Sequence, residues 1–344
     1  MLLLAEVRGG GGRVSEIVLG VGTSHSPMLV LPPSRWREWG ERRDPSLADL
    51  ADESGFIRPF EDWVESRASS IEPELSDEVL EAKGRRCREA TNALAERIRE
   101  ANIDALVVVG DDQSEHIDST NLPPILIHHG SSVYNETPPT PAGAPEILRL
   151  MDLGYYEPEV RREYPIDVEL AESLIANLLD GGFDVATSSQ LPKNRSEGHA
   201  FQYVHRHLAP PGIPSVLVLL NTYVPPAQPR ARRCVEFGRA LRSAIASSPG
   251  GRRVGVVASG GLSHFLVSET LDRMVLDACK VNDLETLCSI SERALQSGSS
   301  EIKNWMVVAG ACEHLAFEVL DYVPGYRTAA GTGTGLAFAS WGPS

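Results

Sequence analysis

The chain has 344 residues, of which 42% are hydrophobic, and a formal net charge of −15. This share of apolar residues is sufficient for a packed core and excludes global disorder. The acidic balance, without a basic stripe, excludes nucleic acid as an expected partner. The five cysteines form no Cys-x-x-Cys pair, which fits reduced thiols of a cytoplasmic protein. No run reaches the roughly 18 apolar residues of a membrane span, so a protein outside the membrane is expected.

The N-terminal part contains two unusual segments. Residues 1–14 are predicted to be a disordered leader, because their apolar start is too short for a signal sequence and glycines follow it. A buried strand is predicted at 17–21, and it leads directly to His25. A long polar segment at about 31–78 contains tryptophans and phenylalanines, which argue against simple disorder. It is either a capping subdomain with its own small core or a lid over the sheet edge that carries His25.

The remaining chain alternates between predicted helices and strands. Helical spacing of apolar residues predicts helices near 79–101, 167–180, 199–208, 229–246, 268–280, 282–295 and 301–320. Short apolar runs predict strands at 105–109, 123–129, 183–186, 214–220, 254–258 and 334–341, and residues 130–165 are expected to be rich in loops. This alternation is typical of an α/β protein with a central, mostly parallel or mixed sheet flanked by helices. We expect one large catalytic domain over 15–344, with an insertion at about 31–78.

Polar side chains follow several of these strands or begin helices. His25, Gln113 and His264 follow predicted strands, and His199 and Glu301 begin predicted helices. Ligands bind at the carboxyl ends of strands in open α/β sheets, so these side chains are expected to meet there. Imidazoles and one carboxylate on one face of a metal are the arrangement of non-haem Fe(II) oxygenases. Taken singly, each residue also has an ordinary structural explanation, such as a first-turn glutamate favoured by the helix dipole.

Three motifs in order give this pattern a more specific meaning. They are Val21–Pro27 (VGTSHSP), Ser259–His264 (SGGLSH) and Ser297–Glu301 (SGSSE), the last followed by Trp305. Together they resemble the class III extradiol ring-cleaving dioxygenases, and in particular the catalytic β subunit of the protocatechuate 4,5-dioxygenase type. The resemblance runs from about residue 15 to the end, apart from 31–78.

The resemblance implies a role for each matching residue. His25 and Glu301 would be iron ligands. His264 would be the acid/base that takes a proton from the catechol. His199 would be a second catalytic histidine of the pocket, in contact with a substrate hydroxyl or ring substituent.

One position departs from the family pattern. The family usually presents a second histidine ligand after its second strand, and Gln113 stands at that position. A glutamine oxygen binds iron weakly, whereas neutral imidazole suits Fe(II) well. Three alternatives are open. Gln113 is itself a metal ligand, a neighbour such as His116, Glu115 or Asp111 takes its place, or the site is metal-poor and serves other chemistry.

The resemblance also implies substrates and partners. A non-haem Fe(II) enzyme of this family would open a catecholic ring, or an aminophenol or dihydroxypyridine analogue, with O₂. Arg195 and Tyr203 are candidates to hold the substrate carboxylate or ring. The competing interpretations are a metal-binding non-oxygenase of the same fold and a metal-dependent hydrolase or lyase. A homo-oligomer, most simply a dimer, is expected, and the need for a small partner subunit stays open.

Overall fold

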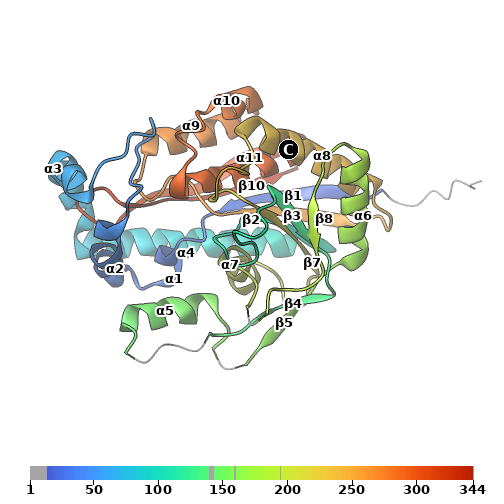
Figure 1. The fold of residues 1–344 in the computed structure, drawn as a ribbon, viewed down its shortest axis with the longest axis horizontal. Helices are drawn as coiled ribbons and strands as arrows, with labels where there is room; N and C mark the ends of the chain where they lie inside the picture. The colour runs from blue at the N-terminus through green and yellow to red at the C-terminus, as the bar shows by residue number, and fades with distance from the viewer. Residues whose placement is uncertain (1–13, 139–142, 159, 194, 344) are drawn as a thin grey trace, which may run out of the picture.

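The computed structural model describes residues 14–138, 143–158, 160–193 and 195–343. The leader predicted at 1–14 therefore lies outside the described residues, except for Val14. The centre is an eight-stranded mixed sheet with the strand order β6-β3-β7-β2-β8-β1-β10-β9 (Figure 1). This single α/β domain confirms the predicted fold class. Within the described residues, no helix is long and apolar enough to cross a membrane.

The middle of the sheet is parallel and buried. Its four strands are β1 (Glu16–Thr23), β8 (Arg253–Ser259), β2 (Ala105–Asp111) and β7 (Ser215–Leu220). Strands covered on both faces are continuously apolar, which is why these runs were recognisable in the sequence. Antiparallel neighbours flank them, and the outer strands complete the sheet: β3 (Ile125–His128), β6 (Ala186–Ser188), β10 (Gly333–Gly342) and β9 (Ala316–Tyr326).

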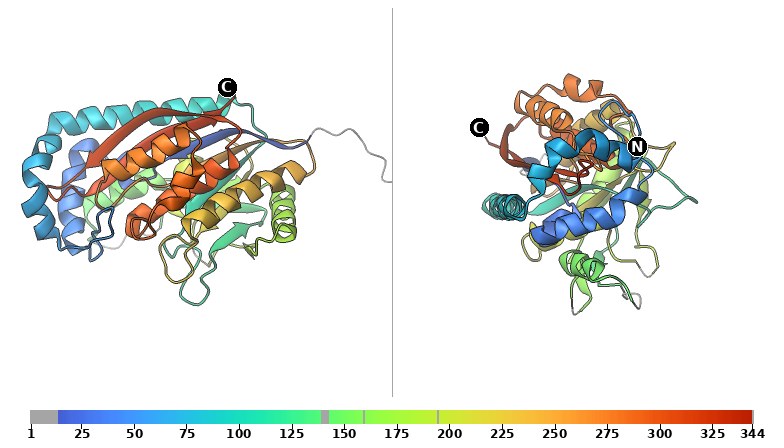
Figure 2. Two further views of the ribbon diagram at one scale, coloured as in Figure 1. Left: turned by 90° about the horizontal axis from the view of Figure 1, so that it is seen from above. Right: turned by 90° about the vertical axis from the view of Figure 1, so that its left-hand side faces the viewer.

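Helices cover both faces of the sheet (Figures 1 and 2). One face packs against α6 (Val168–Asp180), α8 (Ala231–Ser247), α9 (Glu269–Lys280), α10 (Leu284–Ser289) and α11 (Ile302–Ala311). The other face packs against α1 (Pro27–Val30), α2 (Trp36–Arg43), α4 (Asp77–Glu100), α5 (Glu146–Tyr155) and α7 (His199–His207). Each face therefore has its own continuous apolar core.

Two regions differ from the sequence prediction. The helix predicted at 301–320 ends at Ala311, and 316–326 form β9 instead. The segment contains strand-favouring Phe317, Val319 and Tyr322, and antiparallel pairing with β10 completes the strand. Pro324 is tolerated there because β9 is an edge strand. The region 130–165 contains α5 and a two-stranded sheet of β4 (Ser132–Asn135) and β5 (Arg162–Pro165), rather than loops alone.

The segment 31–78 is largely helical. It contains α2, α3 (Phe60–Ile71) and three short 3₁₀ turns. Trp36 is buried and donates a hydrogen bond from Nε1 to the carbonyl oxygen of Met28 at 2.7 Å. Trp63 packs in a small cluster that also contains Leu266 of the C-terminal half. The segment therefore contacts both the N-terminal and the C-terminal half of the chain. That it is an insertion, and where the domain begins and ends, stay predictions.

Candidate active site

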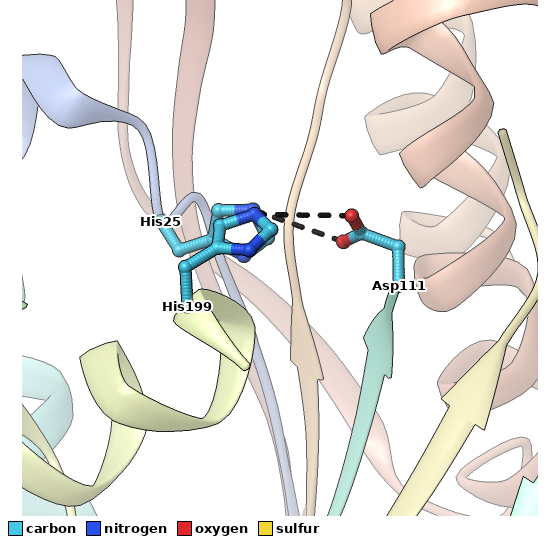
Figure 3. A group of neighbouring side chains, drawn as sticks. All are labelled: His25, Asp111 and His199. Carbon is cyan, nitrogen blue, oxygen red and sulfur yellow. Dashed lines mark ion pairs between the residues drawn. The ribbon is translucent and has the colours of Figure 1, made fainter. Parts of the chain in front are cut away.

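The ends of three adjacent parallel strands bring the candidate residues together. His25 follows β1, Asp111 is the last residue of β2, and Ser259 is the last residue of β8. Because β2, β8 and β1 are neighbours with the same direction, their carboxyl ends share one edge of the sheet. His199 reaches the same place from the start of α7, and Figure 3 shows its ring beside that of His25, with Asp111 pointing toward both.

The hydrogen bonds of His25 determine which ring nitrogen is free. Its Nδ1 lies 3.1 Å from Oγ of Ser259, and that hydroxyl donates to the carbonyl oxygen of Ala200 at 2.7 Å. The only hydroxyl proton of Ser259 is thereby used, so the hydroxyl accepts from a protonated Nδ1 of His25. Burial lowers the pKa of His25 to about 3, so the ring is neutral. Its Nε2 therefore presents a lone pair to the site.

Two buried carboxylates face this lone pair. Nε2 of His25 is 3.4 Å from Oε2 of Glu301 and 3.7 Å from Oδ1 of Asp111. Burial and the neighbouring Glu301 raise the pKa of Asp111 well above its ordinary value. Burial acts in the same direction on Glu301, but His264 and His25 hold the pKa of this carboxyl well below its usual range. Two carboxylates and a neutral imidazole in such proximity form a strong site for a cation.

The other contacts of Glu301 fix its position. Oε2 accepts the backbone N–H of Gly261 at 2.8 Å, and Oε1 accepts the hydroxyl of Tyr223 at 2.6 Å. Nε2 of His264 lies 3.0 Å from Oε1 of Glu301 and 3.3 Å from the hydroxyl of Tyr223. The Tyr223 contact is absent from the sequence prediction. Its position just after β7, a further strand end, is the signal that could have found it.

His199 forms a charged pair with Glu115. Its Nδ1 is 2.8 Å from Oε2 of Glu115, and its backbone N–H donates to Oε1 at 2.9 Å. Burial alone would lower the pKa of His199, but Glu115 outweighs it and raises this pKa to about 10. The pKa of Glu115 falls correspondingly to about 2, against the effect of burial. A carboxylate behind a histidine in this way orients the ring and increases its basicity.

Gln113 lies within this cluster, whereas His116 does not. Nε2 of Gln113 lies 3.4 Å from Oε1 of Glu301, 3.4 Å from Nε2 of His199 and 3.5 Å from Oδ2 of Asp111. Exchanging the amide nitrogen and oxygen would place a carbonyl oxygen at the same point. The ring of His116 instead stacks near Phe201, with centroids 6.3 Å apart. The structure thus brings the predicted position 113 into the site and leaves His116 outside it.

The donor atoms fit a divalent metal. One ligand atom each from His25, Asp111 and His199 lies within 4.8 Å of the others, and Glu301 adds a fourth group next to His25. Two imidazoles and a carboxylate are a typical donor set for Fe(II). Because His199 is protonated beside Glu115 in the metal-free protein, binding through its Nε2 would release a proton. If His25 and Glu301 are two of the ligands, both Asp111 and His199 are candidates for the third.

A cavity of about 270 Å³ opens onto this cluster. One wall carries the cluster itself, with Gln113 and His264. The other lining residues are Trp39 and Arg43 of α2, together with Phe265, Met151, Arg327 and Thr334. The segment 31–78 therefore supplies part of the wall.

The two predicted substrate-binding residues lie elsewhere. Arg195 donates to the backbone carbonyl oxygens of Ser114 and Glu115 and lines a neighbouring, wider cavity. Tyr203 is buried, and its hydroxyl lies 3.2 Å from Oγ1 of Thr91 in α4. It lines a third cavity, between α4 and α1. Neither side chain lines the cavity that contains His25.

Comparisons with known proteins identify the family of this chain. The family described as "Catalytic LigB subunit of aromatic ring-opening dioxygenase" matches residues 79–337, which include Gln113, His199, His264 and Glu301. A gallate dioxygenase of Pseudomonas putida is 37% identical over 93 residues, so the match covers 24% of this chain and 27% of that protein. Among solved structures, the uncharacterized protein JW3007 from Escherichia coli K12 aligns over 94% of this chain and 99% of its own, with 13% identity and a TM-score of 0.39. That structural similarity is too weak to carry an argument. The family match spans most of the chain, and the chain belongs to the catalytic LigB subunit family of aromatic ring-opening dioxygenases.

Proposed function

We propose that the protein is a non-haem Fe(II)-dependent extradiol dioxygenase. It would open a single-ring catechol, or an aminophenol or dihydroxypyridine analogue, with O₂. The observation that carries the proposal is the neutral His25, whose free Nε2 lies 3.4 Å from Glu301, with His264 on the other oxygen of that carboxylate. The cavity of about 270 Å³ supports a small substrate, since it is at the lower end of the roughly 300–1,000 Å³ of ligand pockets.

His25 and Glu301 would hold the iron, with Asp111, Gln113 or His199 as the third ligand. When bound, Fe(II) would acidify the diol and carry electron density from the ring to O₂. The protein would supply the dry, shaped cavity and the proton transfers around it. Gln113 would contribute an amide oxygen where the family has an imidazole, which leaves the metal more weakly held.

His264 is suited to move a proton. Its Nδ1 lies 3.0 Å from the carbonyl oxygen of Leu262, so this nitrogen is protonated. Its Nε2 faces Glu301 and Tyr223 across the cavity wall and can hold a second proton. The ring would take a hydroxyl proton from the substrate and return it to the oxygen that becomes part of the opened product. General acid–base catalysis of this kind contributes about 10²–10⁴-fold to a rate.

His199 is suited to stabilise negative charge. Glu115 keeps its ring protonated, and the ring lies edge-on to that of His25, with centroids 4.5 Å apart. Where Asp111 or Gln113 is the third ligand, this fixed cation beside the metal position would hold an anionic oxygen of the substrate. His199 has this role only where it is not itself a metal ligand.

Anaerobic titration with Fe(II), followed by O₂ uptake with a panel of catechols, gallates, aminophenols and dihydroxypyridines, tests the function. We expect His264→Ala to reduce ring opening by about 100-fold or more while iron stays bound. His129→Ala, a replacement of a partly exposed histidine that pairs with Glu172, is the matched control and should leave the rate unchanged. Uptake that survives intact in His264→Ala would remove His264 from the mechanism, and no uptake by the iron-loaded protein with any compound would count against the dioxygenase.

One observation favours a second candidate. Gln113 replaces the expected histidine ligand, so the chain is alternatively a metal-binding non-oxygenase of the same fold, or a hydrolase or lyase that activates water on the metal. The same O₂ measurement separates these functions, because only the dioxygenase consumes O₂. All five cysteines are free, which supports a reducing, cytoplasmic location. A homodimer remains the expected assembly.

A further inference from the structure

The cavity that contains the histidines is also lined by an arginine to which no acceptor is hydrogen-bonded within the described residues. Arg43 is the last residue of α2, and its side chain is 31% exposed. Within the described parts of the chain, its guanidinium donates no hydrogen bond. Its shortest contact with a carboxylate is 3.7 Å, from Nη1 to Oδ1 of Asp44. A guanidinium has five donors and stays protonated at all ordinary pH values, so this wall presents unused hydrogen-bonding capacity.

Asp44 forms no hydrogen bond with the guanidinium of Arg43, because both oxygens of Asp44 already accept hydrogen bonds from Arg327. Nε and Nη2 of Arg327 donate to the two oxygens of Asp44, each at 2.8 Å, and Thr332 donates to the same carboxylate. Arg327 is 2% exposed and Asp44 is fully buried, so this bidentate pair is closed to other partners. Arg43, Arg327 and Asp44 together have a net charge of +1, and Arg43 is the cation that Asp44 does not pair with closely.

Phe265 holds this cation in place. The guanidinium carbon of Arg43 lies 4.3 Å from the centre of the Phe265 ring, and Trp39 is on its other side at 5.9 Å. Stacking on aromatic faces orients a guanidinium and lowers the entropy lost when it binds a planar anion. Phe265 follows His264 directly, so the arginine and the proton-transferring histidine are held by consecutive residues of one loop.

We propose that Arg43 is a specificity-determining residue that binds a carboxylate on the substrate ring, remote from the two oxygens that face the metal. This inference rests on the proposed function and narrows its substrate class to catechols that carry a carboxylate. Bidentate pairing with a guanidinium suits a planar carboxylate. With iron on one wall and Arg43 on another, the ring would be held at two points. Arg43 suits this role better than Arg327, because Asp44 already takes Nε and Nη2 of Arg327 and the side chain of Arg327 is only 2% exposed.

Anaerobic calorimetry on the iron-loaded protein tests the proposal with two ligands of similar shape, 3,4-dihydroxybenzoate and 4-methylcatechol. A hydrogen-bonded charge pair is worth about 10- to 100-fold in affinity, so the wild type should bind the carboxylate by that factor more tightly. Arg43→Gln should bring the ratio close to one, and Arg43→Lys should retain part of it. Arg42→Gln is the matched control, because it removes an exposed arginine from the neighbouring position of the same helix. An equal preference in Arg43→Gln and the wild type, or no preference in the wild type, would overturn the proposal.

O₂ uptake with the same two ligands separates this proposal from the function on which it rests. Uptake with both compounds at the same kcat/KM would leave the dioxygenase standing and overturn the role of Arg43. A carboxylate preference that disappears in Arg43→Gln, without O₂ uptake by any variant, would support the binding site and count against the dioxygenase. Similar circular dichroism spectra and melting temperatures of Arg43→Gln, Arg43→Lys and Arg42→Gln would show that folding is not the cause.

Discussion

Asp272 should make the stability of this protein decrease as the pH rises through 6. This carboxylate lies in the first turn of α9 and is fully buried behind the loop that carries His264. It accepts hydrogen bonds from the backbone N–H of Ser263 at 2.8 Å, the hydroxyl of Ser263 at 2.9 Å and the hydroxyl of Tyr322 at 2.7 Å. Burial raises the pKa of Asp272 from its ordinary 3.8 to about 6, although these hydrogen bonds act in the opposite direction.

The sign and size of the effect follow from this pKa. The folded protein binds the proton of Asp272 more tightly than the unfolded chain does. The stability from this proton is therefore complete below pH 3.8 and is lost as the pH rises through about 6. One pKa unit corresponds to about 1.36 kcal/mol, so the loss is about 3 kcal/mol in the free energy of unfolding.

Urea unfolding at several pH values between 4 and 8, with the wild type and Asp272→Asn, measures this loss. Asparagine has nearly the same shape but no ionisable proton, so the difference between the two proteins should shift by about 2.4 kcal/mol over this range, which begins just above the unfolded pKa. Asp283→Asn, at the exposed N-cap of α10, is the control and should run parallel to the wild type above about pH 5, because a hydrogen bond from Thr286 lowers the pKa of Asp283 and its titration lies below this range. Parallel curves for Asp272→Asn and the wild type would refute the reasoning.

Three further predictions concern the site. Gly298→Ala would place a Cβ 2.1 Å from Cδ2 of His264, so the ring of His264 must move. O₂ uptake should then fall about 100-fold or more, while the iron content, measured as the control, stays the same. An unchanged rate would contradict the tight packing. Glu115→Gln should lower the pKa of His199 from about 10 by about 1–2 units, because it removes one charge-assisted hydrogen bond. Histidine NMR on the metal-free protein follows this titration. An unchanged titration would show that groups other than Glu115 keep His199 protonated. Gln113→His should tighten Fe(II) binding about 10-fold or more, because imidazole is the better ligand; weaker binding in an anaerobic titration would exclude this side chain from the metal.

Much of the fold could be predicted from the sequence, because its signals are local. The central strands are buried on both faces and read as continuous apolar runs, such as 105–109 and 215–220. The long helix α4 shows a clear helical period, and its apolar positions are the buried ones. The edge strand β9 was missed, because the helical period of 302–311 was extended too far into a segment that contains strand-favouring Phe317, Val319 and Tyr322 and pairs with β10.

The candidate site was predictable only in part. Histidines after strand ends pointed to one edge of the sheet, since parallel strands deliver their carboxyl ends to a common place. The motif resemblance added that His25 and Glu301 belong together, although 276 positions separate them in the sequence. The sequence named Asp111 as one of several alternatives and His199 as a pocket histidine, but only the structure places both next to His25.

The sequence by itself determined the α/β class, the family and the candidate residues at the strand ends, because these depend on local periodicity and on short motifs. Only the tertiary structure decided which neighbours complete the site. His25 is neutral because it is buried, and Ser259 determines which of its ring nitrogens is free. Among the described residues Arg43 has no hydrogen-bond acceptor, because Arg327, 283 positions away, occupies Asp44. Protonation and free hydrogen-bonding capacity depend on which groups are packed together, and that packing joins segments that are remote along the chain.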